Sequence, residues 1–394
     1  MMSKKLIKNG VVITADKKSF LGYVLLEKEQ IIEVGKGDIE VSEAEVINAE
    51  GNYISPGFID IHLHGGGDAD FMDGNQQAYI KAAEMHAKHG TTLMYPTTLT
   101  STNESLYDTF EVFKDAQKAI TNGATLGGLH IEGPYFAYEQ RGAQDPRYLR
   151  NPEPKEYLEI LSKSQDIARW SLAPELPGAY VFAKELDNRG IQVSMAHTNA
   201  TFEEAVRACN SGFSSITHFY SCMSTITRRK AYRYAGVVEC GYYLDDLYLE
   251  IIADGIHVPQ SLLKLIFKIK GTDKIILVTD AMRAAGMGEG KSILGSLSDG
   301  QEIIVEDGVA KLLDKSSFAG SVATADRLIR TVHQLAELPI EECVYMMTVT
   351  PAKLMNIQHY KGKLEKGYDA DILIFDKDVD VKMTIIKGRI VTTK

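Results

Sequence analysis

Six side chains of types that bind metal ions fall at the ends of short apolar runs in this sequence. They are His62, His64, Glu132, His197, His218 and Asp280. His62 and His64 lie two positions apart, so on a β-strand both imidazoles face the same side. Only ten histidines occur in the chain, and four at such positions are hard to obtain by chance. Imidazoles and carboxylates without thiolate suit Zn²⁺, Fe²⁺, Mn²⁺ or Co²⁺. The sequence therefore predicts a divalent metal site rather than packed core histidines.

The segments that must position these side chains alternate between strand-like and helix-like patterns. Eight apolar runs end in polar residues, at 57–64, 91–98, 126–133, 168–175, 191–197, 214–220, 249–257 and 275–280. Of the helical patterns between them, one ends before Gly90, and another starts with Thr201 and Glu204 spaced as a capping box. Eight such units predict an α/β fold, a (β/α)₈ TIM barrel, with the active site at the carboxyl ends of its strands. A doubly wound sheet is the competing layout, but the glycine run 65–67 forms no GxGxxG turn.

Both ends of the chain differ from this alternating middle. Residues 5–50 and the stretch after Asp369 have the pattern of short strands, with Asn-Gly and Gly-Lys-Gly as turn signals in the first of them. The sequence thus predicts a small β-sandwich domain built from residues 1–54 and 357–394, and a catalytic barrel domain of residues 55–356. Strand-like pieces within 290–316 predict a hairpin over the barrel mouth.

The composition limits the classes of partner. The chain has 394 residues, 44% of them hydrophobic, which is ample for a large barrel and a smaller unit. A net charge of −10 argues against a nucleic-acid or anionic-membrane surface, although a local arginine cluster can still bind a small anion. The four cysteines form no CxxC pair and are expected to be free thiols. With no apolar stretch of membrane-span or signal-peptide length, we expect a cytoplasmic protein.

Nine motifs, in order along the chain, resemble those of N-acetylglucosamine-6-phosphate deacetylases, a family of the amidohydrolase superfamily. They are PGFIDIHLHGGG, GLHIEGPYF, LAPE, AHTNA, THFYSCMS, ADGIHV, LVTDAM, FAGS and TPAKLM. The resemblance runs from about Leu6 to the C-terminus. The HxH pair alone indicates the superfamily. The Glu-Gly-Pro sequence after the third strand, without a lysine on the fourth, is more specific to this family.

The resemblance implies a metal-ligand set. Glu132, His197 and His218 resemble the principal ligands. His62 and His64 resemble the ligands of a second metal, with Glu132 bridging the two. The chain is therefore expected to bind one or two divalent ions per subunit, Zn²⁺ first, with Fe²⁺, Mn²⁺ and Co²⁺ as alternatives.

The resemblance also implies residues that act on the substrate. Asp280 resembles the catalytic acid/base, which takes a proton from the attacking water and hands it to the leaving amine. His257 resembles a substrate-contacting histidine, for the oxyanion or a sugar hydroxyl. Ala143 and Gly320, in RGAQ and FAGS, are expected to line the substrate pocket. His130 faces the same side as Glu132 and either orients a ligand or packs in the core.

The phosphate-binding half of the pocket departs from the family pattern. The resemblance places the phosphate on the backbone amides of Ser221 and Cys222 and on Arg229, supplied by the partner subunit of a homodimer. An Asn-Ala pair is usual at the first two positions. Residues 228–234 are more basic than usual, which fits arginine–phosphate contacts. Gln144 stands where histidine is common. We expect these departures to gather around the sugar phosphate rather than the metal.

The predicted function is hydrolysis of the acetamide of N-acetylglucosamine 6-phosphate, which gives glucosamine 6-phosphate and acetate. The nearest alternative is the same reaction on N-acetylgalactosamine 6-phosphate. Another N-acyl amidohydrolase is a second alternative, which the basic loop disfavours. A catalytically silent barrel that binds a sugar phosphate is a third, and the complete set of ligands together with Asp280 argues against it.

Overall fold

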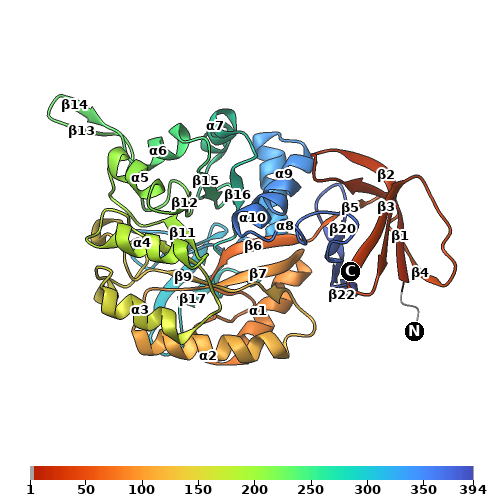
Figure 1. Ribbon diagram of the computed structural model, residues 1–394, viewed down its shortest axis with the longest axis horizontal. Coiled ribbons are helices and arrows are strands. Elements are labelled where there is room, and N and C mark those ends of the chain that lie inside the picture. The colour runs from red at the N-terminus through yellow and green to blue at the C-terminus, as the bar shows by residue number, and fades with distance from the viewer. Residues whose placement is uncertain (1–3, 394) are drawn as a thin grey trace.

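The computed structural model describes residues 4–393 and contains a central barrel of parallel strands (Figure 1). In chain order the barrel strands are β6 (Phe58–Leu63), β7 (Thr91–Thr98), β9 (Leu129–Glu132), β10 (Ile167–Leu172), β11 (Gln192–Met195), β12 (Phe213–Ile216), β15 (Tyr248–Ile251) and β16 (Ile275–Leu277). Each strand pairs with the next, and a short strand β8 (Thr125–Leu126) adds to β7. The ring closes where the Asp280 N–H donates to the His62 carbonyl at 2.8 Å. The predicted (β/α)₈ barrel is confirmed.

Helices follow the barrel strands and cover their outer surface. They are α1 (Gln76–Lys88), α2 (Asn103–Ala119), α3 (Pro154–Lys163), α4 (Ala179–Asn188), α5 (Phe202–Cys209), α6 (Val237–Tyr243), α7 (Gln260–Lys270), α8 (Ala325–Thr331), α9 (Ile340–Met346) and α10 (Val349–Leu354). Two 3₁₀ turns, η1 (Tyr138–Gln140) and η2 (Pro146–Tyr148), and a π-helical turn, η3 (Val332–Ala336), complete the set. Thr201 and Glu204 form the predicted capping box of α5. Within residues 4–393, none of the helices has both the length and the apolar character needed to cross a bilayer.

The two chain ends build a separate β domain at one side of the barrel (Figure 1). Its strands are β1 (Lys4–Ile13), β2 (Ser19–Glu27), β3 (Gln30–Lys36), β4 (Ala44–Asn48), β5 (Tyr53–Pro56), β20 (Ile372–Phe375), β21 (Val381–Ile386) and β22 (Arg389–Thr393). They form one sheet, in which C-terminal β20 pairs antiparallel with N-terminal β5. A β domain assembled from both termini is confirmed, with its strands joined in a single sheet. The boundaries at 54/55 and 356/357 remain our proposal, and β5 extends across the first of them.

Two smaller sheets lie on loops that follow barrel strands. β17 (Gly290–Leu294), β18 (Gln301–Glu306) and β19 (Val309–Leu312) form an antiparallel sheet after β16. This sheet contains the predicted hairpin and one further strand, and the residues that follow it help to line the pocket at the barrel mouth. The hairpin of β13 (Thr227–Arg229) and β14 (Tyr232–Tyr234) projects away from the barrel (Figure 1).

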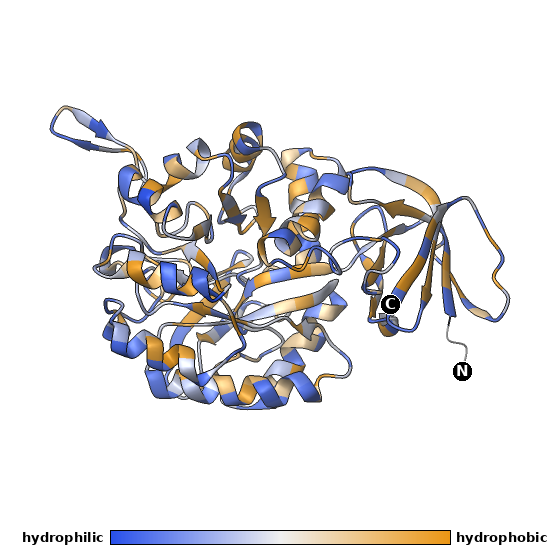
Figure 2. Ribbon diagram, viewed as in Figure 1, coloured by the Kyte–Doolittle hydropathy of each residue, from blue (hydrophilic) through white to orange (hydrophobic). Residues whose placement is uncertain are grey.

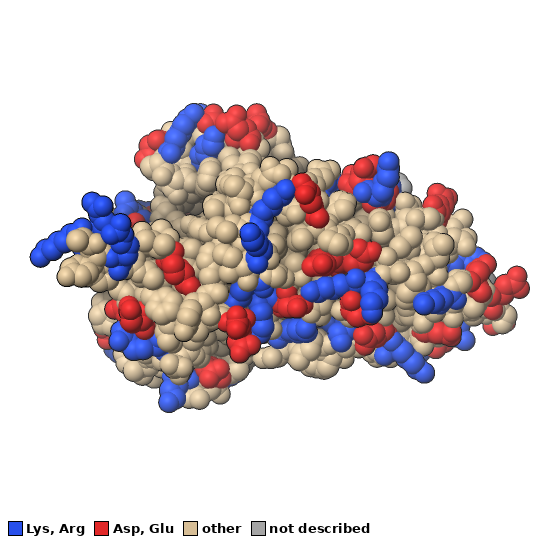
Figure 3. Space-filling model, turned by 90° about the horizontal axis from the view of Figure 1, so that it is seen from above, with Lys and Arg blue, Asp and Glu red and all other residues tan. Residues whose placement is uncertain are grey.

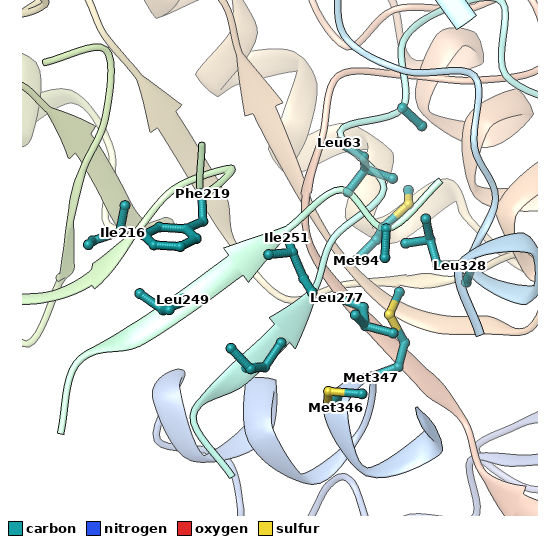
Figure 4. Packing of buried hydrophobic residues seen from close by; sticks show 14 of the residues in the cluster. Leu63, Met94, Ile216, Phe219, Leu249, Ile251, Leu277, Leu328, Met346 and Met347 are labelled. Atoms are coloured by element: carbon teal, nitrogen blue, oxygen red, sulfur yellow. The ribbon is translucent and has the colours of Figure 1, made fainter. Parts of the chain in front are cut away.

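The main core lies between the barrel strands and the helices around them. Ile216, Leu249 and Leu277, on neighbouring strands, belong to one buried cluster with Met346 and Met347 at the end of α9 (Figure 4). Burying a side chain of this size contributes about 1.5–3 kcal/mol. In Figure 2, hydrophobic residues accordingly lie mainly on the strands, and hydrophilic residues lie on the outer faces of the helices. The helices thus hold the strand ends, and the side chains that they carry, in place.

The barrel interior, by contrast, holds a chain of polar side chains. Thr97 hydrogen-bonds with His130 at 3.1 Å, and His130 with Ser171 at 2.7 Å. Ser171 contacts Thr217 at 2.9 Å, and Thr217 donates to Ser194 at 2.6 Å. Both ring nitrogens of His130 therefore form hydrogen bonds with side chains on neighbouring strands.

One buried histidine gives the fold a measurable pH dependence. Burial lowers the pKa of His86, whose imidazole hydrogen-bonds the Gly65 carbonyl, to about 4. Between pH 6.5 and 4 the unfolded chain binds a proton there and the folded chain does not, so stability falls as the pH falls. Between pH 7.5 and 5, His86 should lower the free energy of unfolding by about 2 kcal/mol. Urea unfolding of His86→Gln should show a correspondingly shallower pH dependence. Exposed His359→Gln should keep the original slope, and equal slopes for all three proteins would contradict the assignment.

Candidate active site

The six predicted metal-site and catalytic residues converge at one end of the barrel. His62 lies on β6 and His64 directly after it, while Glu132 is the last residue of β9. The others, His197, His218 and Asp280, follow β11, β12 and β16. All six are at least 93% buried. The rim therefore collects residues that lie as far as 218 positions apart in the sequence.

Glu132 is at the centre of this cluster. Its Oε1 lies 3.2 Å from His218 Nε2, 3.5 Å from His62 Nε2 and 3.6 Å from His197 Nε2. Its Oε2 lies 3.4 Å from His64 Nε2. The cluster thus contains two groups that share Glu132, one with His62 and His64 and one with His197 and His218, and the ligand atoms within each lie within 4.8 Å of one another.

The backbone at three of these positions has an unusual conformation. His197, His218 and Asp280 have φ angles of 44°, 32° and 48°, a left-handed region that few non-glycine residues occupy. Such residues cost about 1–3 kcal/mol each and concentrate at functional sites. Here the conformation turns the chain at the strand end and leaves all three side chains in the cluster.

The charges in the cluster favour a cation at its centre. Burial alone would raise the pKa of Glu132, but His62 and the hydrogen-bonding imidazoles hold that pKa well below its usual range. Burial alone would lower the pKa of His64, but Asp280 and Glu132 raise it to about 10. The carboxylates of Glu132 and Asp280 therefore favour positive charge at the centre of the cluster. A divalent ion can supply that charge in place of protons.

The residues present fit a metal ion. Both ring nitrogens of His62 are buried and lack a hydrogen-bond partner among residues 4–393. Its Nε2 faces Glu132 and, at 3.4 Å, Asp280 Oδ1, both beyond a normal hydrogen bond. Because buried polar atoms are nearly always satisfied, an unpartnered nitrogen that faces two carboxylates fits the role of a ligand to a cation.

A pocket of about 550 Å³ opens beside this cluster. It is lined by His64, Glu132, His197, His218 and Asp280, whereas His62 is fully buried and does not line it. Five of the six predicted substrate-binding residues also line it: His257, Ser221, Cys222, Ala143 and Gly320. The structure therefore brings the metal-ligand cluster and these residues around one space of substrate size.

Arg229 is the predicted substrate residue that does not line this pocket. It lies on the exposed β13–β14 hairpin, where its guanidinium is 5.4 Å from the centre of the Tyr234 ring. Ser221 also departs from the expectation, because its N–H already donates to the His218 carbonyl at 2.8 Å. Of the predicted amide pair, Cys222 is left as the candidate for a phosphate contact.

Gln144 contacts the metal-ligand cluster, so the expectation that this departure belongs to the sugar-phosphate pocket alone is corrected. Its side-chain amide donates to Glu132 Oε2 at 2.8 Å and accepts from the Thr100 N–H at 2.9 Å. The side chain is buried and also lines the pocket. It therefore fixes one oxygen of the carboxylate that both metal-ligand groups share. The family motif identified the position in the sequence but not this partner.

Removing this amide should weaken metal binding. Groups that hydrogen-bond to metal ligands typically contribute about 10–100-fold to metal affinity. We expect Gln144→Ala to lose about that factor in Zn²⁺ affinity, measured by competition with a chelating dye. Gln140→Ala is a matched control, because that side chain donates to Asn199 instead. Unchanged affinity in Gln144→Ala would show that Glu132 needs no such support.

His257 is held by a residue that the sequence analysis did not name. Its Nδ1–H donates to Asp254 Oδ2 at 2.8 Å, and Asp254 Oδ1 accepts the backbone N–H groups of Ile256 and His257. Fixing Nδ1 in this way presents Nε2 as the atom that can meet a substrate. The Asp-x-x-His spacing of the ADGIH motif was the signal for this pair.

Comparisons with known proteins agree with this geometry. The sequence model of the amidohydrolase family matches residues 53–391. N-acetylglucosamine-6-phosphate deacetylase of Lysinibacillus sphaericus is 33% identical over 98% of this chain and 97% of its own. N-acetylgalactosamine-6-phosphate deacetylase of Escherichia coli O157:H7 is 29% identical over 89% of this chain and 91% of its own. The structure of a mutant Mycobacterium smegmatis N-acetyl-D-glucosamine-6-phosphate deacetylase, in complex with N-acetyl-D-glucosamine-6-phosphate, matches with a TM-score of 0.90 and 27% identity over 99% of this chain and 100% of that one. The chain belongs to the amidohydrolase family, and within it to the N-acetylglucosamine-6-phosphate deacetylase family.

Proposed function

We propose that this protein hydrolyses the acetamide of N-acetylglucosamine 6-phosphate to glucosamine 6-phosphate and acetate. The observation that carries the proposal is the convergence of Glu132, His197, His218 and Asp280 at the floor of one pocket. Relatives with the same named activity cover nearly the whole chain. The proposal thus rests on both the chemistry of the site and its family.

Glu132, His197 and His218 would hold one divalent ion, and His62 and His64 would hold a second through shared Glu132. When bound, such an ion would lower the pKa of a water molecule, so that hydroxide is available near neutral pH, and would provide Lewis-acid polarisation. We propose Zn²⁺, because imidazole and carboxylate ligands suit it, with Fe²⁺, Mn²⁺ and Co²⁺ as alternatives. The chain's own residues then have to move the proton and hold the sugar.

Asp280 is the proposed acid/base. Burial raises the pKa of Asp280, but the neighbouring imidazoles of His62 and His64 lower this pKa by more than burial raises it, so the carboxylate is ionised and can accept a proton. Its Oδ1 lies 3.2 Å from His64 Nε2 and 3.4 Å from His62 Nε2, on one side of the cluster. The carboxylate can take the proton of the attacking water and deliver it to the leaving nitrogen.

His257 is the residue that we propose contacts the substrate. With its Nδ1 bound by Asp254, Nε2 can donate to the developing oxyanion or to a sugar hydroxyl. Phe318 packs against the imidazole with the ring centres 4.5 Å apart. The ring orientation is thereby fixed before substrate arrives.

The basic hairpin is the proposed source of a phosphate contact in a homodimer. Arg228, Arg229, Lys230 and Arg233 are exposed on β13, β14 and their turn, and Lys and Arg side chains gather on this projection in Figure 3. Arg229 lies outside its own chain's pocket, so we propose that it reaches the pocket of a partner subunit. We also propose that the protein works in the cytoplasm.

The galactosamine epimer is a second candidate substrate, because a relative named for that activity is 29% identical. Acetate release from both N-acetylhexosamine 6-phosphates and from unphosphorylated N-acetylglucosamine, with and without a chelator, separates the possibilities. We expect chelator-sensitive release from N-acetylglucosamine 6-phosphate, with the highest kcat/KM of the three. A higher kcat/KM for the galacto epimer favours the second candidate, and equal turnover of the unphosphorylated sugar contradicts both.

A further inference from the structure

We propose that Glu250, on β15 inside the barrel, is a positioning residue that keeps a proton on His62 Nδ1 and thereby presents His62 Nε2 to a divalent cation. The inference deepens the proposed function and rests on its metal site. It assigns a role to a carboxylate that neither binds the ion nor lines the substrate pocket.

The first observation is a pair of unsatisfied atoms that face each other. His62 and Glu250 are both fully buried. His62 Nδ1 and Glu250 Oε2 each lack a hydrogen-bond partner among residues 4–393, and they lie 3.6 Å apart. A buried donor and a buried acceptor normally find partners. A small ring movement on metal binding would bring these two atoms into hydrogen-bond contact.

The second observation is the ion pair that holds Glu250. Its other oxygen, Oε1, is paired with Arg169 on β10, which is itself fully buried. Arg169 Nη1 also donates to the Ile61 carbonyl at 3.0 Å. The ion pair keeps Glu250 in its charged form and fixes the strand directly before His62. Glu250 also offsets the buried charge of the Arg169 guanidinium, which would otherwise repel a cation bound at His62.

The consequence for His62 is a single tautomer. An imidazole that donates its Nδ1–H to a carboxylate leaves Nε2 unprotonated, more basic and correctly oriented for a metal ion. That Nε2 is the atom that faces Glu132 and Asp280. Carboxylates that support a metal-bound histidine in this way typically contribute about 10–100-fold to metal affinity.

The arrangement predicts an asymmetric effect. Of the four histidines in the cluster, His62 is the one that Glu250 contacts. The side chains of His197 and His218 instead contact Glu132 and each other. Loss of the Glu250 carboxylate should therefore weaken the ion at His62, His64 and Glu132. The ion at Glu132, His197 and His218 should keep its affinity, which a general loss of stability would not allow.

The test measures how many Zn²⁺ ions the full-length chain binds and the affinity of each. Metal-free protein is titrated with Zn²⁺ against a chelating dye, and Glu250→Gln should weaken one of two ions about 10–100-fold and leave the other within about twofold. Arg169→Met/Glu250→Met removes both charges, avoids an unpaired buried guanidinium, and should show the same selective loss. Ser215→Ala, at another buried polar position of the barrel sheet without a hydrogen-bond partner among residues 4–393, should bind both ions normally.

A spectroscopic readout tests the tautomer directly. In the zinc-loaded protein, a two-bond ¹H–¹⁵N spectrum should show His62 protonated at Nδ1, with its signal identified by its absence from His62→Gln. In Glu250→Gln the signal should shift toward mixed tautomers. Protonation of His62 at Nε2 in the unaltered loaded chain overturns the inference.

The remaining outcomes separate this inference from the proposed function. The positioning role is overturned if the two Glu250 variants bind both ions with wild-type affinity, or if both ions are weakened equally. In either case, acetate release by the unaltered chain still upholds the proposed function. An unaltered chain that binds a single ion, at His197 and His218, overturns the inference as well. Selective weakening together with no acetate release from any amino-sugar phosphate upholds the positioning role and rejects the function.

Discussion

Asp280→Asn is expected to lower kcat for acetate release by about 10²–10⁴-fold, the contribution typical of a positioned general acid/base. Asparagine keeps the shape of the side chain but cannot take the proton of the attacking water. Because Asp280 belongs to neither group of potential metal ligands, the variant should keep its bound metal. Steady-state kinetics and metal analysis on the same preparation measure both quantities.

Asp326→Asn is the matched control for Asp280. Asp326 is also a buried aspartate, but it pairs with His89 on the outer side of the molecule and does not line the pocket. Its replacement should leave kcat within about threefold, since only interactions made at the transition state change the chemical step. An Asp280→Asn protein with full metal content and undiminished turnover would remove Asp280 from the mechanism.

Removal of the metal should have an effect of similar size. Extensive chelation, or His218→Ala, should reduce acetate release at least about 10³-fold, because both the activated water and the charge stabilisation are lost. The thermal midpoint should fall as well, since a ligand present at 100 times its Kd stabilises the folded state by about 2.7 kcal/mol. Kinetics, metal content and calorimetry on the stripped, reloaded and variant proteins check these expectations.

The exposed histidine His359 provides the control for His218. His359→Ala removes an imidazole outside the barrel rim and should retain metal, turnover and thermal midpoint. Reloading the chelated wild-type protein with Zn²⁺ should restore its activity, whereas His218→Ala should stay inactive at the same Zn²⁺ concentration. Full turnover after verified removal of the metal would rule out the proposed chemistry.

The barrel and its rim could be predicted because strand ends leave a clear pattern in the sequence. A run of apolar residues that stops at His62-x-His64, or just before Asp280, shows both where a strand ends and what it carries there. Parallel strands closed into a barrel put all such ends on one rim. Local periodicity and one topological rule were therefore enough to bring distant residues such as His64 and His218 together.

The contacts that support these residues could not be predicted in the same way. Gln144 is on a loop, and no local pattern shows that its amide reaches Glu132. Arg169 and Glu250 each appear as a single charge within an apolar run. An isolated buried charge requires a partner, but the sequence does not say which one, because the pairing crosses the barrel. The sequence likewise does not show that the Ser221 N–H, which the family resemblance places on the phosphate, instead donates to the His218 carbonyl within a turn.

The pairing of β5 with β20 has a consequence for synthesis on the ribosome. Ile54 lies opposite Ile374, which leaves the ribosome 320 residues later. At about 5–20 residues per second this delay lasts roughly 15–65 seconds. During that time the first strands expose an open edge and the apolar side chains that later pack against the C-terminal strands, which invites association with other nascent chains. Lowering the growth temperature, or co-expressing a chaperone that binds nascent chains, should therefore raise the recovered yield more for this protein than for a barrel without the split domain.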